Sequence, residues 1–200
     1  MSVSYRYLLF FKPFRVLSQF SPEGDKQTLA DFLGAIGKDI YPVGRLDYDS
    51  EGLLLLTNDK SLTHRLLNPD EAHPRTYWVQ VEGTISDPAL AQLRSGLTIS
   101  VDGRKHITRP ATVIRLENPE VLPRNPPIRH RAAIPTSWIA LTLTEGKNRQ
   151  VRRMTAAVGF PTLRLIRTAI GPLKAGNMVP GTWREVSEGE IFAGFSGKKK

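Results

Sequence analysis

The stretch GRLDYDSEGLLLLTND, residues 44 to 59, places four consecutive leucines directly behind a loop of charged residues. Residues 53 to 56 have the length of a buried strand, and residues 57 to 59 supply turn residues at its end. A short apolar run does not by itself exclude a helix. The charged residues of the loop are Arg45, Asp47, Asp49 and Glu51. A charged loop at the mouth of a buried strand is a candidate functional site.

The composition sets the class of protein. The chain has 200 residues, of which 40% are hydrophobic, which suits one globular domain with a real core. No stretch reaches the roughly 20 apolar residues of a membrane span. The first residues meet Lys12 and Pro13 too early to form a secretory signal. We therefore expect a soluble protein of the cytoplasm.

The chain offers few ligands for a metal. It has no cysteine, which removes disulfides, thiolate chemistry and cysteine-zinc sites. The chain has four histidines, His64, His73, His106 and His130. They are too far apart in the sequence to indicate a metal cluster. We expect no metal.

The charge balance points to a polyanionic partner. The formal net charge is +9, and each phosphate that such a protein neutralises releases condensed counterions. Basic residues gather in three runs in the C-terminal half of the chain, at 124 to 131, 147 to 153 and 164 to 174. A single run is usually a solvated face, but three runs in one half favour a binding surface.

Hydrophobic periodicity and turn residues predict the order of elements. Strands are expected at residues 5–13, 53–56, 75–83, 107–116, 137–146 and 161–171. Helices are expected at residues 28–37, after a cap at Ser61, from Asp87 to Gly96, and at 147–159. Strands that follow one another as often as they follow helices indicate an α+β fold, with a mainly antiparallel mixed sheet and flanking helices.

Two segments have a particular character. Residues 118–137 form a long, basic, proline-rich loop, which is typical of a functional or disordered segment. The helix expected at 147–159 buries Val151, Met154 and Val158 and turns basic residues outward at spacings of three and four, namely Arg149, Arg152 and Arg153. We expect one domain over residues 1–195 and a flexible basic tail at 196–200.

Three segments together resemble the motifs of the pseudouridine synthases. GRLDYDSEGLLLLTND resembles their catalytic GRLD motif, and RTYWVQVEG resembles their tyrosine-bearing second motif. EGKNRQVRRM, followed by RLIRTAIG, is similar to their third. The resemblance runs from about residue 7 to about residue 186. The basic proline-rich loop before the third motif is most similar to the RluE branch of the RsuA-type enzymes.

The resemblance implies the pseudouridine synthase catalytic fold and isomerisation of a specific uridine to pseudouridine in large-subunit, 23S ribosomal RNA. It implies no cofactor and no metal, and we expect a monomer. The catalytic positions it implies are Asp47, Tyr77 and Arg152. The RNA-binding positions we expect are Arg45, Leu165, Lys147, Arg149, Arg153, Arg164 and Arg167.

The chain departs from the family pattern in three respects. No S4-type RNA-binding domain precedes residue 1, so we expect the domain to find its RNA with its own basic surface. Phe11 and Arg15 stand where many relatives have Asn and Gly. Ser50 replaces a frequent Thr.

The residues also support the chemistry directly. Breaking a glycosidic bond develops positive charge at C1′, which a carboxylate such as Asp47 stabilises or captures covalently. A cation beside that carboxylate keeps it ionised, and the family match assigns that place to Arg152. The detached uracil must rotate before it bonds through C5, and a flat ring such as that of Tyr77 holds it without preventing rotation. The hydroxyl of Tyr77 would assist loss of the C5 proton.

Two other classes remain open. A non-catalytic RNA-binding or ribosome assembly protein explains the charge, but it gives no reason for an acidic side chain in a basic surface. A glycosidase or nuclease would pair Asp47 with Asp49 or Glu51, although Asp47 and Asp49 point in opposite directions if the backbone is extended. Without the resemblance, Asp47 would be a turn residue, Tyr77 a core aromatic and Leu165 a core leucine.

Overall fold

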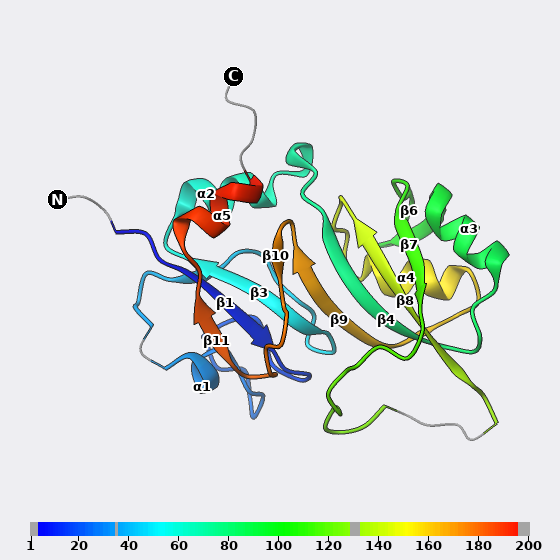
Figure 1. Cartoon of the computed structure of the whole chain (residues 1–200), viewed down its shortest axis with the longest axis horizontal. Helices are drawn as coiled ribbons and strands as arrows, with labels where there is room; N and C mark the ends of the chain where they lie inside the picture. Colours follow the sequence, from blue (N-terminus) through cyan, green and yellow to red (C-terminus); the bar gives the residue numbers. More distant parts are fainter. Residues whose placement is uncertain (1–3, 35, 129–132, 196–200) are drawn as a thin grey trace. The chain divides into compact units, whose positions relative to one another are not determined.

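A computed structural model describes residues 4–34, 36–128 and 133–195 (Figure 1). The chain forms two compact units, one of Met1–His73 with Arg167–Lys200 and one of Pro74–Ile166. The expected single domain over residues 1–195 stays a prediction. The expected flexible tail, residues 196–200, lies outside the described residues.

The sheet of the first unit is built around two fully buried strands. β1 (Tyr7–Lys12) lies between β3 (Glu51–Thr57) and β11 (Trp183–Glu185) and is antiparallel to both. Figure 1 shows this order. β2 (Tyr41–Pro42) also pairs with β3, and β10 (Leu173–Lys174) pairs with the end of β9 (Thr162–Ile170). Every residue of β1 and β3 is buried, so the four leucines form a buried strand as predicted.

The helices of the first unit are short. They are α1 (Ala30–Leu33), α2 (Lys60–Leu67), a 3-10 turn (Pro69–Glu71) and α5 (Glu188–Phe195). The predicted helix at 28–37 is therefore wrong in length, because Gly34 adopts a φ of 55° and ends it after one turn. The predicted cap at Ser61 is also wrong. Asp59 caps α2 instead, and its carboxylate accepts a hydrogen bond from the Leu62 N–H at 2.9 Å.

Two hydrophobic clusters hold this unit together. One lies beneath α2 and α5, where Leu62 and Leu66 pack in the same cluster as Ile191 and Phe195. The other contains the apolar residues around α1, among them Leu29, Leu33 and Ile36, together with Leu8, Phe10, Leu54 and Leu56 from β1 and β3. Alternate residues of the two strands thus face different clusters, so the central strands are buried on both faces.

The strands of the second unit are paired antiparallel. β8 (Thr136–Leu143) lies between β4 (Arg75–Glu82) and β7 (Thr112–Leu116) and is antiparallel to both. A separate antiparallel hairpin consists of β5 (Thr98–Val101) and β6 (Arg104–Ile107). The helices of this unit are α3 (Asp87–Ser95) and α4 (Gln150–Ala157). The predicted α+β class with mainly antiparallel pairing is confirmed.

Local sequence explains most elements of this unit. β4 buries Val79 and Val81 completely, as its alternation predicted. Ser86 caps α3 and Gly96 ends it, so the predicted start and end are confirmed to within a residue. The predicted strand at 107–116 is wrong in extent, because it comprises the end of β6 and all of β7. Pro110 lies in the interruption, where it cannot donate to a strand ladder.

The core of the second unit lies between the sheet and its two helices. Val151 and Met154 of α4 are buried there, and Val158 packs against the same cluster. The predicted inner face of this helix is thus confirmed. Within the described residues, none of the helices has the length and apolar character to cross a membrane.

Candidate active site

Hydrogen bonds fix the backbone on both sides of Asp47. The Ser18 hydroxyl donates to the Leu46 carbonyl at 2.9 Å and accepts from the Leu46 N–H at 3.1 Å. The Ser50 N–H donates to the Asp47 carbonyl at 3.0 Å. The backbone of the Asp47 loop, residues 44–50, is thus anchored, and the Asp47 side chain is half-buried. A reactive group on a fixed backbone is held close to one geometry.

Arg15 supports the same loop from a strained conformation. Its N–H donates to the Tyr48 carbonyl at 2.8 Å. Its φ is 58°, in the left-handed region that favours glycine. A glycine is what the family pattern expects at this position, so the backbone conformation explains that preference and Arg15 adopts it at a cost in strain.

Gly52 sets the point where the loop becomes strand β3. Its φ is 105°, and an added Cβ would collide with the backbone of Arg167 in β9. The Arg167 side chain continues the contact, because its Nε donates to the Leu53 carbonyl at 2.7 Å. Only glycine permits this close approach, which fixes the start of β3 and therefore the end of the Asp47 loop.

Lys12 is a buried cation in the same unit. Its side chain is 0% exposed, and its Nζ donates to the carbonyls of Pro13 and Val16 at 2.9 and 2.8 Å. Burial lowers the pKa of Lys12 to about 7, although the carboxylates of Glu51, Asp49 and Asp47 oppose that shift. The Asp47 loop therefore has a titratable amine beneath it, with its acidic side chains in electrostatic range.

Tyr77 and Leu165 belong to the core of the second unit. Tyr77 is half-buried on β4, opposite Leu141 of β8, and packs against the cluster that contains Leu165. Leu165 is 6% exposed on β9. The structure thus brings both residues to one hydrophobic cluster. A half-buried aromatic ring at the edge of such a cluster has an apolar body and a polar hydroxyl.

The two arginines of α4 differ in their partners. Arg152 is half-buried, and its Nη1 donates to the Thr162 carbonyl at 3.4 Å. Arg153 is half-buried as well, and its guanidinium donates to the carbonyls of Ser100 and Asn148. The sequence predicted that both side chains turn outward, and in the structure each is half-buried and reaches a backbone carbonyl.

The predicted basic surface divides into two groups. Arg45, Lys147 and Arg149 are exposed. Arg164 and Arg167 are only 6% and 5% exposed, so the prediction that they contribute to an exposed surface is wrong. The Arg164 guanidinium donates to the Leu122 carbonyl at 2.9 Å, and that of Arg167 to Leu53. A guanidinium inside a protein needs such acceptors, and these carbonyls supply them.

Sequence reasoning missed Lys12, Glu145 and Gln150. Lys12 interrupts an apolar run, YLLFFK, which is the available sign that this strand buries a charge. Glu145 and Gln150 lie within the third motif, where the arginines drew attention instead. Across residues 4–34, 36–128 and 133–195 the structure brings no three acidic or histidine side chains together as a metal site.

Comparisons with known proteins identify the family to which the chain is similar. Residues 6–157 match the family model described as RNA pseudouridylate synthase. The chain is 49% identical over 182 residues to ribosomal large subunit pseudouridine synthase E of Vibrio vulnificus, covering 91% of this chain and 75% of the relative. It is 51% identical over 180 residues to the protein of the same name from Xanthomonas campestris, covering 88% of this chain and 93% of the relative.

A solved structure gives the same result for the fold. The crystal structure of a pseudouridylate synthase superposes with a TM-score of 0.76 at 27% sequence identity. The match covers 94% of this chain and 73% of that chain. The predicted catalytic fold is confirmed by this likeness.

Proposed function

The chain belongs to the RNA pseudouridylate synthase family, and we propose that it isomerises a specific uridine of 23S ribosomal RNA to pseudouridine. The observation that carries the proposal is identity of about half the residues, over 91% and 88% of the chain, to two relatives named ribosomal large subunit pseudouridine synthase E. A ribosomal RNA substrate also implies that the enzyme acts in the cytoplasm, where we propose it works as a monomer.

We assign the nucleophile to Asp47. Its carboxylate attacks C1′ of the target uridine or stabilises the positive charge that develops there, while the bond to N1 of uracil breaks. The anchored backbone of the Asp47 loop favours this role, because it limits the positions the carboxylate can take. The uracil then rotates, and C5 bonds to C1′ as any bond between Asp47 and C1′ breaks. C5 then loses its proton, and N1 takes one up. No atom or electron is gained overall, so the reaction requires no oxidant, reductant or co-substrate, and we propose that it uses neither cofactor nor metal.

We assign supporting roles to three residues of the second unit. Tyr77 stacks on the uracil ring and its hydroxyl assists loss of the C5 proton. Leu165 contacts the same ring, and both residues belong to one hydrophobic cluster. Arg152 pairs with the Asp47 carboxylate during catalysis and keeps it ionised and aimed.

The remaining basic residues are proposed to hold the RNA. Arg45, Lys147 and Arg149 are exposed and carry charges that suit phosphate contacts. Arg153 is half-buried and carbonyl-bound, so its contribution is smaller than the sequence predicted. The target base is stacked or paired in folded RNA, and contacts of this kind offset the few kcal/mol needed to flip it out.

The test uses 23S ribosomal RNA labelled with tritium at C5 of uridine. Wild-type enzyme releases tritium with one pseudouridine formed per tritium lost, and the RNA keeps its mass apart from the label. Asp47→Asn binds the RNA but releases no tritium. A wild-type protein that binds the RNA without releasing tritium would instead support an RNA-binding or assembly protein. Free uracil or shortened RNA would support a glycosidase or nuclease.

A further inference from the structure

We propose that the β5–β6 hairpin and the loop before α4 form a site for a backbone phosphate of the substrate RNA. The inference rests on the proposed function, because it adds a contact for the RNA of that reaction. Arg104 and Lys147 are the phosphate ligands, and His106 lines the site beside them. Glu145 and Gln150 are positioning residues behind it.

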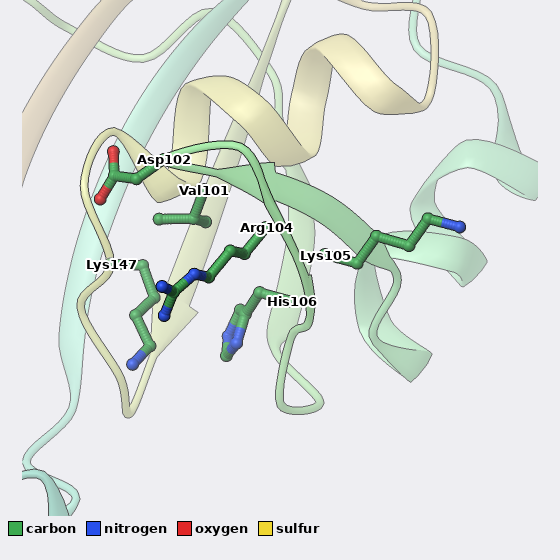
Figure 2. Close-up of a pocket in the computed structure, with 6 residues that line it drawn as sticks. All are labelled: Val101, Asp102, Arg104, Lys105, His106 and Lys147. Atoms are coloured by element: carbon green, nitrogen blue, oxygen red, sulfur yellow. The ribbon is translucent and has the colours of Figure 1, made fainter.

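Arg104, His106 and Lys147 line a surface pocket of about 500 Å³, which we call the basic pocket. Its lining residues are Val101, Asp102, Arg104, Lys105, His106 and Lys147. Arg104 and His106 lie two residues apart on β6, so their side chains leave the same face of the strand, and Lys105 leaves the other. Figure 2 shows Arg104, His106 and Lys147 gathered on one side and Lys105 pointing away from them.

The two cations of the basic pocket are free to bind an anion. Arg104 and Lys147 are exposed, and within the described parts of the chain neither side chain has a hydrogen bond or an ion pair. The carboxylate among the lining residues belongs to Asp102, which lies at the turn of the hairpin and points away from His106 in Figure 2. A planar guanidinium and an ammonium on one side of a pocket suit the oxygens of a phosphate.

A partly buried chain of hydrogen bonds joins the two walls of the basic pocket. His106 Nε2 lies 3.2 Å from Glu145 Oε2 on the hairpin side. Glu145 Oε1 accepts from Gln150 Nε2 at 2.6 Å, and Gln150 Oε1 accepts from the Lys147 N–H at 2.9 Å. Gln150 is 4% exposed, and the Glu145 side chain is 9% exposed. The network therefore ties the β6 strand that carries Arg104 to the backbone of Lys147 before any ligand binds, which lowers the entropic cost of binding.

The hydrogen bonds around Glu145 favour its ionised carboxylate. It also accepts the Arg109 N–H at 2.8 Å, so three donors meet one carboxylate. Burial raises the pKa of Glu145, but the donors from Arg109, Gln150 and His106 outweigh burial and leave the pKa below its ordinary value. The carboxylate therefore stays charged and keeps the hairpin and the loop together over the range in which RNA binds.

The location favours RNA over other anionic partners. Lys147 and Arg149 belong to the proposed RNA surface, and the basic pocket extends that surface onto the hairpin. Arg153 of α4 donates to the Ser100 carbonyl of β5, so the hairpin is fastened to the helix of the third motif. A polyanion that lies along α4 would thus meet a second, rigidly attached set of cations on the hairpin.

The test compares a double variant with a matched control in the full chain. Arg104→Gln with Lys147→Gln removes the two proposed ligands, and Lys105→Gln removes an equal exposed charge from the opposite face of the same strand. All three residues are exposed, so the fold should persist. Binding of a labelled 23S ribosomal RNA fragment is measured over a series of KCl concentrations, and turnover is measured at saturating RNA.

We expect the double variant to lose roughly 1.4 to 1.8 from the magnitude of the slope of log K against log salt, at about 0.7 to 0.9 per contact. Its Kd at low salt should rise roughly tenfold or more. Lys105→Gln should keep the wild-type slope.

Two results would overturn the inference. One is a double variant with the wild-type salt slope and affinity. The other is a Lys105→Gln variant that loses half as much of the salt slope as the double variant, since the effect would then come from diffuse charge and not from a site. A wild-type enzyme that forms no pseudouridine refutes the proposed function instead, and the salt slopes still decide whether the basic pocket binds RNA.

Discussion

The Asp47 loop and the basic pocket carry charges of opposite sign, and the structure constrains these charges to different degrees. The Asp47 loop has a hydrogen-bonded backbone, a half-buried carboxylate and the fully buried Lys12 in electrostatic range. The basic pocket has the exposed cations Arg104 and Lys147, whose backbone is positioned by a partly buried network, while their own side chains have no protein partner in the described residues. The first arrangement limits movement of the charge, and the second leaves the charge available.

The difference follows from what each charge must do. A nucleophile acts on one atom, and misplacement by about 1 Å can reduce the rate a hundredfold. A phosphate contact acts through long-range attraction and released counterions, so the ends of the side chains tolerate motion. Changes at the Asp47 loop should therefore alter turnover or folding, and changes at the basic pocket should alter affinity and its dependence on salt.

The largest effect is expected at Asp47. Asp47→Asn keeps the shape and removes the negative charge, so turnover should fall at least about a thousandfold. RNA affinity should stay within about threefold of wild type, because no phosphate ligand is lost. Single-turnover tritium release and filter binding measure the two quantities. Residual turnover within tenfold of wild type would contradict the nucleophile assignment.

Gly52→Ala tests the rigid start of β3. The substitution combines a positive φ of 105° with a collision against the Arg167 backbone, and it should cost about 3 kcal/mol of the free energy of unfolding. Gly24→Ala is the control, because Gly24 also has a positive φ, 58°, but no atom within 4 Å of an added Cβ. It should cost about 1 kcal/mol. Equal costs in urea unfolding would show that the close approach to β9 contributes nothing.

Substitutions of the neighbouring residues Arg152 and Arg153 should have different effects on turnover and RNA binding. Arg152→Met should lower turnover at saturating RNA about a hundredfold, because the nucleophile loses its proposed partner. Arg153→Met should leave turnover nearly unchanged and weaken RNA binding, with a salt slope smaller by up to about 0.9. Rapid-quench kinetics and binding titrations separate the two. An Arg152→Met defect that high RNA concentration cures completely would refute the role in catalysis.

The last expected effect is the pH dependence that Lys12 gives to stability. Its pKa is about 7 in the folded protein and 10.5 ordinarily, so between these values the unfolded chain binds more protons. The free energy of unfolding therefore rises with pH across this window, at up to about 1.4 kcal/mol per pH unit.

Lys12→Met should remove that rise, whereas Lys60→Met, at an exposed lysine, should keep it. Urea unfolding at half-unit steps from pH 6 to pH 10 measures the slope for each protein. A Lys12→Met protein with the wild-type slope would show that another group titrates in this range.

Local sequence was enough where short-range rules decide the structure. The leucine run of β3, the alternation of β4, the cap and end of α3 and the inner face of α4 all follow from residues close together in the chain. Asp59, and not Ser61, caps α2. Both residue types are favourable at a helix N-cap, so the sequence did not distinguish between them. The end of α1 was mispredicted for a similar reason. Gly34 and Gly37 can each end a helix, and α1 ends at Gly34.

The arginines of β9 show why charge alone was misleading. Arg164 and Arg167 looked like surface residues because an isolated buried guanidinium is strongly unfavourable. Each is buried because a carbonyl distant in sequence accepts its hydrogen bond, Leu122 for Arg164 and Leu53 for Arg167. No pattern within β9 records those partners, so the sequence predicted a strand and misjudged its charged side chains.

The sequence by itself determined the family and many of the strands and helices, and it supports the proposal that Asp47 is the nucleophile, because each of these depends on residues that are close together in the chain. The tertiary structure decided which charged side chains are buried and hydrogen-bonded, and which are exposed and able to bind a ligand. Glu145 and His106 are 39 residues apart, yet their contact joins the hairpin to the loop that carries Lys147. Burial and hydrogen bonding depend on neighbours in space, and for these groups the neighbours come from distant parts of the chain.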